Sequence, residues 1–171
     1  DMQVGYLDYI SSVLNVSLFY VRGNHDEIYE FERRPGGDDL HQRIVTFRGY
    51  SFLGLEGSIN YNRGRVQYTD NEMFVKVLRL LPRLLVLRSV RGYSVDVVVA
   101  HSPPHGIHDI ADDRAHRGFR AFRMLMKWGH PRYLIHGHVD TWDTRQPTET
   151  IFCKTRVINI NPSRALTLEP H

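Results

Sequence analysis

SLFYVRGNHD, residues 17–26, joins a short apolar segment to a polar turn. Leu18–Val21 is predicted to form a buried strand that runs directly into a Gly-Asn-His-Asp turn at residues 23–26. A junction of this kind places polar side chains at the carboxyl end of a strand, where open α/β sheets hold their ligands. Because Gly and Asn are also common in ordinary β-turns, the rest of the chain has to decide between a turn and a site.

Two further apolar segments end in the same way. Residues 95–101 read VDVVVAH and residues 133–138 read YLIHGH, so each predicted strand is followed by histidine. In the first turn, Asn24 offers a carbonyl oxygen, His25 a group that exchanges a proton near neutral pH, and Asp26 a carboxylate able to orient that imidazole. Three strand ends with this chemistry favour a ligand site in an α/β fold over a simple turn.

Composition places the chain among ordinary globular proteins. With 171 residues, 42% hydrophobic and 24% charged, residues 1–171 are expected to form a single domain. No apolar run approaches the roughly 20 residues of a membrane helix, so we expect no membrane partner. The one cysteine, Cys153, excludes an internal disulfide framework and a cysteine-based zinc site. This pattern favours a cytoplasmic location.

The histidines indicate a functional site more strongly than the net charge does. The net charge is +3, and nineteen of the 22 basic residues are arginine, which suits phosphate binding and keeps nucleic acid open as a partner. A compositional bias of the source genome explains the arginines better. Seven of the ten histidines, however, lie between His101 and His138. Such clustering indicates a metal or acid–base site.

Hydrophobic periodicity predicts the remaining elements. A capping box at Thr69–Glu72 is expected to open a helix, and Pro82 to end that helix and begin a second one. Glu27–Asp39 and Gly57–Arg65 are expected to be surface loops because of their glycine and charge content. The other predictions are helices over 6–14 and 119–126, and strands over 44–47, 51–55, 95–100, 133–135, 150–152 and 156–160.

The residue types at these strand ends suit divalent metal chemistry. A catalytic divalent ion takes imidazole nitrogens and carboxylate or amide oxygens, and it leaves a position for water. Two such ions about 3.5–4 Å apart can share a bridging hydroxide and clamp the attacking and leaving oxygens of a phosphoryl group. A nearby imidazole that binds no metal can then donate a proton to the departing alcohol.

The order of the motifs resembles that of the calcineurin-like metallophosphoesterase family. The motifs are GNHD at residues 23–26, the strand ending in Ala100-His101, and Gly137-His138 within HGHVD. The resemblance implies two mixed β-sheets packed as a sandwich and flanked by helices. It also implies hydrolysis of phosphomonoester or phosphodiester substrates by two divalent ions, commonly manganese, iron or zinc.

The resemblance also implies roles for individual residues. Asn24, His101 and His138 would bind the second metal. His25 would be the unligated imidazole near the leaving group, with Asp26 holding it. Asp1 is a candidate for the bridging aspartate of the family's Gly-Asp motif, although a terminal residue at a cut would look the same.

Two features depart from the family pattern. The opening strand with its Asp-x-His motif has no counterpart, so the resemblance implies that the domain is N-terminally truncated and that this chain alone turns over little substrate. The final motif, usually Gly-His-x-His, has Asp140 in place of the second histidine, and a carboxylate can still bind metal. His136 is the other candidate, but strand alternation directs it to the opposite face from its neighbours, which favours a packing or supporting role.

Two other functions use the same sequence features. One is a non-catalytic scaffold of this fold that binds protein partners, and its mark would be the loss of ligands. The other is a nuclease of the same chemistry, which a basic groove would support and a compact pocket would disfavour. His105, His108 and His116 lie near the proposed site in sequence and could contact substrate, although loop exposure explains them as well. Tyr61 and Tyr68 could line the mouth of the site, although a core or surface position explains them better, and Asp109, Asp112 and Asp113 are expected to be solvated.

Overall fold

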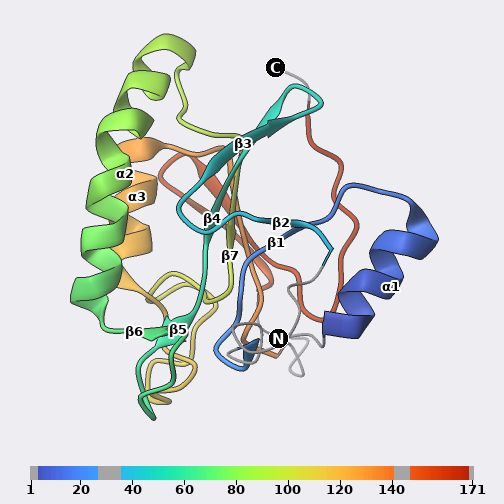
Figure 1. Ribbon diagram of the computed structural model, residues 1–171. Helices are drawn as coiled ribbons and strands as arrows, with labels where there is room; N and C mark the ends of the chain where they lie inside the picture. The colour runs from blue at the N-terminus through green and yellow to red at the C-terminus, as the bar shows by residue number, and fades with distance from the viewer. Residues whose placement is uncertain (1–3, 27–35, 141–146, 170–171) are drawn as a thin grey trace.

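The computed structural model describes residues 4–26, 36–140 and 147–169. Its centre is a six-stranded mixed sheet with the strand order β3-β4-β7-β8-β10-β9 (Figure 1). The strands are β3 (Ile44–Phe47), β4 (Tyr50–Leu55), β7 (Val97–Ala100), β8 (Tyr133–His136), β9 (Glu149–Phe152) and β10 (Thr155–Asn159). The α/β class expected from the sequence is confirmed.

The direction of the strands gathers the candidate site residues. β3 and β4 form the expected antiparallel hairpin, and β9 and β10 form another at the opposite edge. Between them β4, β7, β8 and β10 run parallel to one another. Their carboxyl ends therefore meet at one edge of the sheet, which is where ligands bind in open α/β folds.

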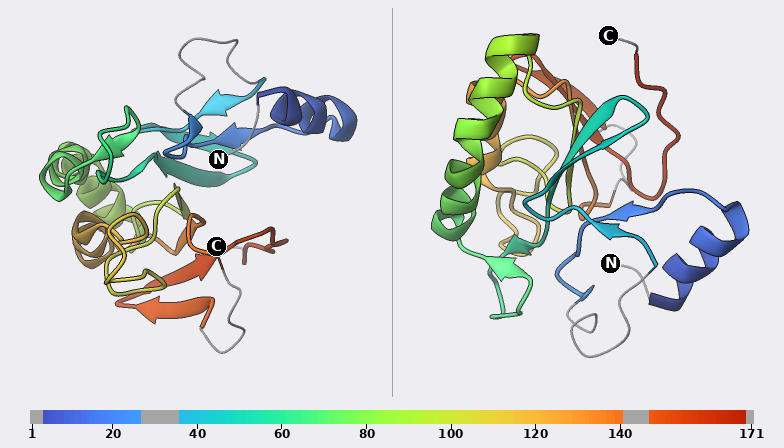
Figure 2. Two further views of the ribbon diagram at one scale, coloured as in Figure 1. Left: turned by 90° about the horizontal axis from the view of Figure 1, so that it is seen from below. Right: turned by 45° about the horizontal axis from the view of Figure 1, so that its top comes forward.

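Side-chain alternation separates two apolar faces of this sheet. Val98, Leu134 and Val157 point into the larger core. The helices α2 (Asp70–Arg91) and α3 (Arg120–Gly129) cover that face side by side, as Figure 2 also shows. The neighbouring residues of the same strands, Val97 and Ile158 among them, belong to a smaller cluster on the other face.

Helix α2 corrects one prediction from the sequence. The capping box is present, because Thr69 accepts from the Glu72 backbone N–H and the Glu72 carboxylate accepts from the Thr69 N–H. Pro82, however, lies inside one continuous helix instead of dividing two. Its ring is on the exposed side, while Leu81 and Leu84 are buried. Burial of that apolar face outweighs the roughly 3 kcal/mol that an internal proline costs a helix.

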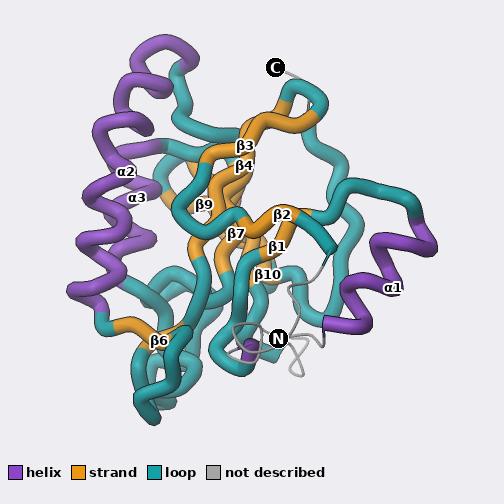
Figure 3. The backbone as a smooth tube through the Cα atoms, in the orientation of Figure 1, coloured by secondary structure: helices purple, strands orange, loops and turns teal. Residues whose placement is uncertain are grey.

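The other face of the sheet carries a small second layer. Helix α1 (Val4–Leu14) leads to β1 (Phe19–Tyr20), which pairs in parallel with β2 (Asp38–Asp39); both strands lie between α1 and the large sheet (Figure 3). The Phe19 ring packs against those of Phe47 and Phe52, with centroids 5.4 and 5.8 Å apart. β1 is shorter than the strand predicted over Leu18–Val21. β2 lies at the end of Glu27–Asp39, a segment predicted to be a loop. Residues 27–35 of that segment are outside the described part.

A second short pair lies where the sequence predicted only a loop. β5 (Ser58–Ile59) pairs in parallel with β6 (Gln67–Tyr68), and residues 60–66 connect them. Gly57 precedes β5 with φ 81°, and a Cβ there would lie 2.5 Å from the Val66 carbonyl oxygen. The close approach of the two short strands therefore requires glycine at this position. Among the helices described, none is long and apolar enough to cross a bilayer.

Candidate metal centre

The GNHD turn presents its middle residues in opposite directions. The Asp26 carboxylate accepts a hydrogen bond from the Gly23 N–H at 2.7 Å, and the Asp26 N–H donates to the Gly23 carbonyl at 3.2 Å. This closed turn buries Asn24, which is 3% exposed, and leaves His25 at the surface. One tight turn thereby supplies an inward amide and an outward imidazole.

His101 follows β7 and meets this turn from the centre of the sheet. Its backbone N–H donates to the Leu55 carbonyl at 3.2 Å, which continues the β4–β7 pairing one residue past the strand. The side chain is buried, and its Nε2 lies 2.9 Å from Asn24 Oδ1 and 3.0 Å from His138 Nδ1. His101 therefore contacts both Asn24 and His138, the two residues predicted from the sequence to share a site with it.

His138 reaches that point because the chain leaves β8 at Gly137. Alternation alone would place His136 and His138 on the same face, but His138 has φ 66°, a left-handed conformation that turns its ring away. Its Nε2 lies 2.7 Å from the Ala115 carbonyl, which only accepts, so Nε2 carries the proton. The lone pair of His138 is consequently on Nδ1 and faces His101.

Both imidazoles are held in the neutral form that metal binding requires. Burial lowers the pKa of His101 well below its usual value, and the neighbouring His138 lowers that pKa further. Burial also lowers the pKa of His138, although the hydrogen bond to Ala115 acts against this effect. Near neutral pH both rings are therefore uncharged and do not repel a cation, and an ion bound at His101 Nε2 would take the place of the proton that this nitrogen shares with Asn24 Oδ1.

The donor set fits one divalent cation. Ligand atoms about 2.1 Å from an ion, at right angles to each other, are about 3.0 Å apart, close to the 2.9 and 3.0 Å measured around His101 Nε2. The third donor is an amide, and the part of the chain that is described holds no cluster of three or more His, Cys, Asp or Glu side chains suited to a metal. The three residues that could hold the ion are Asn24, His101 and His138.

A pocket of about 530 Å³ opens beside these residues. His25, His101, His138 and Asp140 all line it, so four of the residues selected from the sequence border one cavity. Its other lining residues are Phe19, Tyr20, Val21, Val99, Ala100, His116, Gly137, Ile160, Asn161 and Pro162. Within the described ranges, no lysine or arginine lines the pocket.

The remaining candidates lie in different places. Asp140 is exposed, and its Oδ1 accepts a hydrogen bond from Asn161 Nδ2 at 2.8 Å. Asp1 lies outside the described residues. His136 is completely buried and contacts His108, with 3.1 Å between Nε2 and Nδ1. It does not line the pocket, which agrees with the supporting role expected for it.

Two further residues reach the site from outside the three strand-end motifs. The Tyr61 hydroxyl lies 3.0 Å from Asn24 Nδ2, 37 residues away along the chain. His116 lines the pocket with its ring 5.1 Å from that of His138, and its Nδ1 is 2.5 Å from the Asp113 carboxylate. The Asp-x-x-His spacing was the available hint for His116. Asp109, expected to be solvated, instead accepts from the Gly106 and Gly118 N–H groups and holds this loop together.

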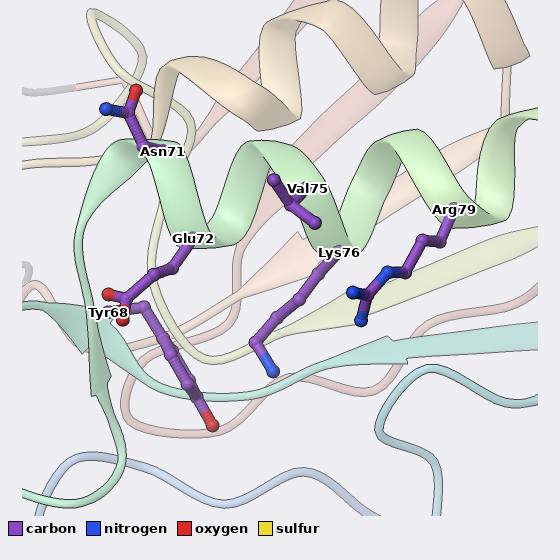
Figure 4. Close-up of a pocket in the computed structure, with 6 residues that line it drawn as sticks. All are labelled: Tyr68, Asn71, Glu72, Val75, Lys76 and Arg79. Carbon is purple, nitrogen blue, oxygen red and sulfur yellow. The ribbon is translucent and has the colours of Figure 1, made fainter.

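A second pocket, of about 410 Å³, lies along α2, and among the described residues no histidine lines it (Figure 4). Its charged groups serve the local structure. The Glu72 carboxylate caps the helix, and the Lys76 ammonium lies 4.4 Å from the centre of the Tyr68 ring. The residues selected from the sequence do not line it, so the candidate metal centre belongs to the pocket at the strand ends.

Comparison with known proteins identifies the family. The sequence profile described as calcineurin-like phosphoesterase matches residues 1–140. The chain belongs to this family. The resemblance read from the GNHD, Ala100-His101 and HGHVD motifs is thus confirmed, and the family is one of metal-dependent phosphoesterases. A search of curated proteins finds no match.

Solved structures share the fold of this chain. A crystal structure 21% identical to the chain aligns with a TM-score of 0.60 over 92% of this chain and 63% of its own length. The crystal structure of TT1561 of Thermus thermophilus, 14% identical, aligns with a TM-score of 0.61 over 92% of this chain and 68% of its own. The chain therefore spans less than two thirds of the first of these proteins.

Proposed function

We propose that this chain is a metal-dependent phosphoesterase domain that hydrolyses phosphomonoesters or phosphodiesters with two divalent ions, of the manganese, iron or zinc type. One observation carries the proposal. The side chain of His101 lies within hydrogen-bond distance of both Asn24 and His138, and His101, His138 and His25 line one pocket. Family membership supports the reaction type.

Asn24, His101 and His138 would hold one ion. The second ion would depend on Asp140, which lines the pocket, and on Asp1 as the carboxylate shared by both ions. Bound divalent ions would supply Lewis-acid activation of the phosphoryl group and of the attacking water. The contribution of the chain is to keep its imidazoles neutral and their lone pairs aimed at one point.

His25 would protonate the leaving alcohol. Its exposed ring lines the pocket one residue after the buried Asn24, so it reaches the substrate without joining the ligand set. A positioned imidazole typically contributes about 10²–10⁴-fold to such a proton transfer. Asp26 would keep the ring in place by closing the turn through the Gly23 N–H.

The shape of the pocket favours a small ester over a nucleic acid. A nuclease would need a cationic groove that follows the phosphate backbone. The cavity is about 530 Å³, and its polar lining in the described ranges consists of histidine, aspartate, asparagine and tyrosine side chains. The arginines of the sequence therefore do not argue for a nuclease at this site.

The proposal is tested with p-nitrophenyl phosphate, Mn²⁺ and the chain itself. We expect slow hydrolysis that depends on Mn²⁺, that stops when EDTA is added, and that is absent from His101→Ala. A variant of the exposed residue Val90, Val90→Ala, is the matched control and should behave as the wild type. Hydrolysis that survives EDTA and His101→Ala would contradict the proposal, as would a wild-type chain that neither binds Mn²⁺ nor hydrolyses the ester.

A further inference from the structure

The loop between β5 and β6 is held in shape by one buried side chain. Gln67 is 6% exposed, and its Oε1 accepts from the backbone N–H groups of Tyr61, Asn62 and Gly64 at 3.2–3.3 Å. Its Nε2 donates to Asn62 Oδ1 at 2.6 Å. Because four hydrogen bonds converge on one amide, the position of Tyr61 is defined by the fold.

The same segment is fastened to the strand that precedes the GNHD turn. The Gly57 N–H donates to the Arg22 carbonyl at 2.9 Å. The Arg22 guanidinium donates to both oxygens of the buried Glu56 carboxylate, at 2.8 and 3.2 Å, and the Tyr68 hydroxyl donates to the same carboxylate at 2.5 Å. Bidentate pairs of this kind are strong and geometrically specific. The loop and the turn are therefore joined into one unit.

From this unit the Tyr61 hydroxyl reaches Asn24. It lies 3.0 Å from Nδ2 and accepts one of its hydrogens. The two ends of a carboxamide are nearly equal in size but opposite in function, because the oxygen has lone pairs and the nitrogen only donates. With Nδ2 engaged by Tyr61, Oδ1 faces His101 Nε2 at 2.9 Å. The reversed amide would present N–H groups where a cation needs a lone pair.

We propose that Tyr61 is a positioning residue of the metal centre, which holds the Asn24 carboxamide by its nitrogen while its oxygen faces the cation. This inference rests on the proposed function, because it assumes that Asn24 is a metal ligand. Tyr61 itself does not line the pocket, so it acts through Asn24 and not on the substrate.

Tyr61→Phe tests the inference through metal affinity. We expect the Kd for Mn²⁺, measured by isothermal titration calorimetry on the whole chain, to rise by about tenfold or more, the usual effect of losing a group that orients a ligand. Tyr50→Phe is the matched control, since it removes a tyrosine hydroxyl that donates to the Leu168 carbonyl, outside the unit that carries Tyr61. It should leave the Kd within about twofold of the wild type.

A carboxylate at position 24 separates orientation from general support. Asp has two equivalent oxygens and no wrong end, so in an Asn24→Asp background the same Tyr61→Phe change should cost less than about threefold. An equal loss of affinity in both backgrounds would show that Tyr61 supports the fold without orienting the amide, and would overturn the inference.

A measurement on the metal-free wild type does not depend on any variant. In a ¹⁵N-edited NMR spectrum, the side-chain NH₂ of Asn24 should show a nuclear Overhauser effect to the Tyr61 ring, and none would contradict the inference. If the wild type binds Mn²⁺ and Tyr61→Phe binds it equally well, this inference fails while the proposed function stands. If the wild type binds no Mn²⁺, both fail.

Discussion

Two pairs of imidazoles lie at the carboxyl ends of β7 and β8, and they differ in what surrounds them. His101 and His138 approach to 3.0 Å between nitrogens, border the pocket and share their contact point with the amide of Asn24. His108 and His136 approach to 3.1 Å, and His136 has no exposed surface. The distances are alike, so distance alone does not distinguish a ligand pair from a structural one.

The second pair forms a continuous chain of hydrogen bonds that runs from the Gly137 carbonyl to the Thr150 hydroxyl. His136 Nδ1 donates to the Gly137 carbonyl at 3.1 Å, so His136 Nε2 must accept from His108 Nδ1. His108 Nε2 then accepts from the Thr150 hydroxyl at 2.9 Å. Every ring nitrogen has a protein partner, and burial lowers the pKa of His136 to about 3. This pair therefore joins the loop after β7 to β8 and β9.

The difference between the pairs lies in the acceptors. Around His101 Nε2, two atoms with lone pairs, Asn24 Oδ1 and His138 Nδ1, point to the same place. In the buried pair, donors and acceptors alternate and leave no lone pair for a cation. The comparison teaches that two features of a histidine cluster indicate whether it binds a metal. They are the hydrogen-bond role of each ring nitrogen, donor or acceptor, and the access of the cluster to a pocket.

The largest effect is expected from the first pair. His101→Ala removes a nitrogen from the centre of the proposed ligand set, so metal binding and activity should be lost together. Loss of several kcal/mol of transition-state stabilisation corresponds to about 10³-fold or more in kcat/KM. Calorimetric titration with Mn²⁺ and steady-state kinetics measure the two effects. Retained affinity for Mn²⁺ would place the ion elsewhere.

His25→Ala should separate chemistry from metal binding. Metal content should remain nearly unchanged, while kcat falls by about 10²–10⁴-fold with an alkyl phosphate ester. The loss should be much smaller with an activated aryl phosphate, because its leaving group needs no proton. Metal analysis alongside kinetics is the check. If His25→Ala strips the metal as fully as His101→Ala does, His25 is a ligand.

The buried pair should respond in stability and not in affinity. His136→Leu leaves the His108 Nδ1–H without its acceptor inside the protein, which should lower the free energy of unfolding by about 1–3 kcal/mol. The Kd for Mn²⁺ should stay within about threefold of the wild type, because His136 supplies no lone pair to the site. Urea denaturation measures the first quantity. A loss of affinity as large as that of His101→Ala would erase the distinction between the two pairs.

The last prediction concerns the pH dependence of stability. Burial lowers the pKa of His136 and His108 in the folded state. Above pH 6.5 both imidazoles are neutral in the folded and the unfolded chain, so they do not reduce the free energy of unfolding there. Below pH 6.5 the unfolded chain binds protons that the folded chain does not, so stability falls as pH decreases, by up to about 1.4 kcal/mol per pH unit per proton. His136→Leu should show a shallower decline between pH 6.5 and 4.5, measured by urea denaturation at each pH. An unchanged slope would contradict the burial of a neutral imidazole.

The α/β fold and the convergence on His101 of Asn24 and His138 could be predicted from the sequence, because both follow from local patterns of residues. Apolar segments at 95–100 and 133–135 specify parallel strands, and the residues after them must meet at one edge. The break predicted at Pro82 was wrong because burial of the apolar face of α2 outweighs the local cost of the proline. β2 was not predicted because a strand of two residues has no periodicity to detect. Tyr61 and Asn24 meet only through the packing of the β5–β6 segment, which no spacing records.

The same limit applies to the two histidines of β8. Strand alternation assigns His136 and His138 to one face, and the left-handed backbone of His138 is what separates them. A sequence contains no direct signal for that conformation at a non-glycine residue. Its consequence is that one strand end supplies both the buried pair and the pair at the pocket.

The most direct test of the account is the position of a bound ion. Crystals of the chain soaked in Mn²⁺ should show an anomalous scattering peak within about 2.0–2.4 Å of His101 Nε2, His138 Nδ1 and Asn24 Oδ1, with none at the His108–His136 pair. An ion bound by His108 or His136, or a fully soaked crystal with no peak among Asn24, His101 and His138, would contradict the central claim.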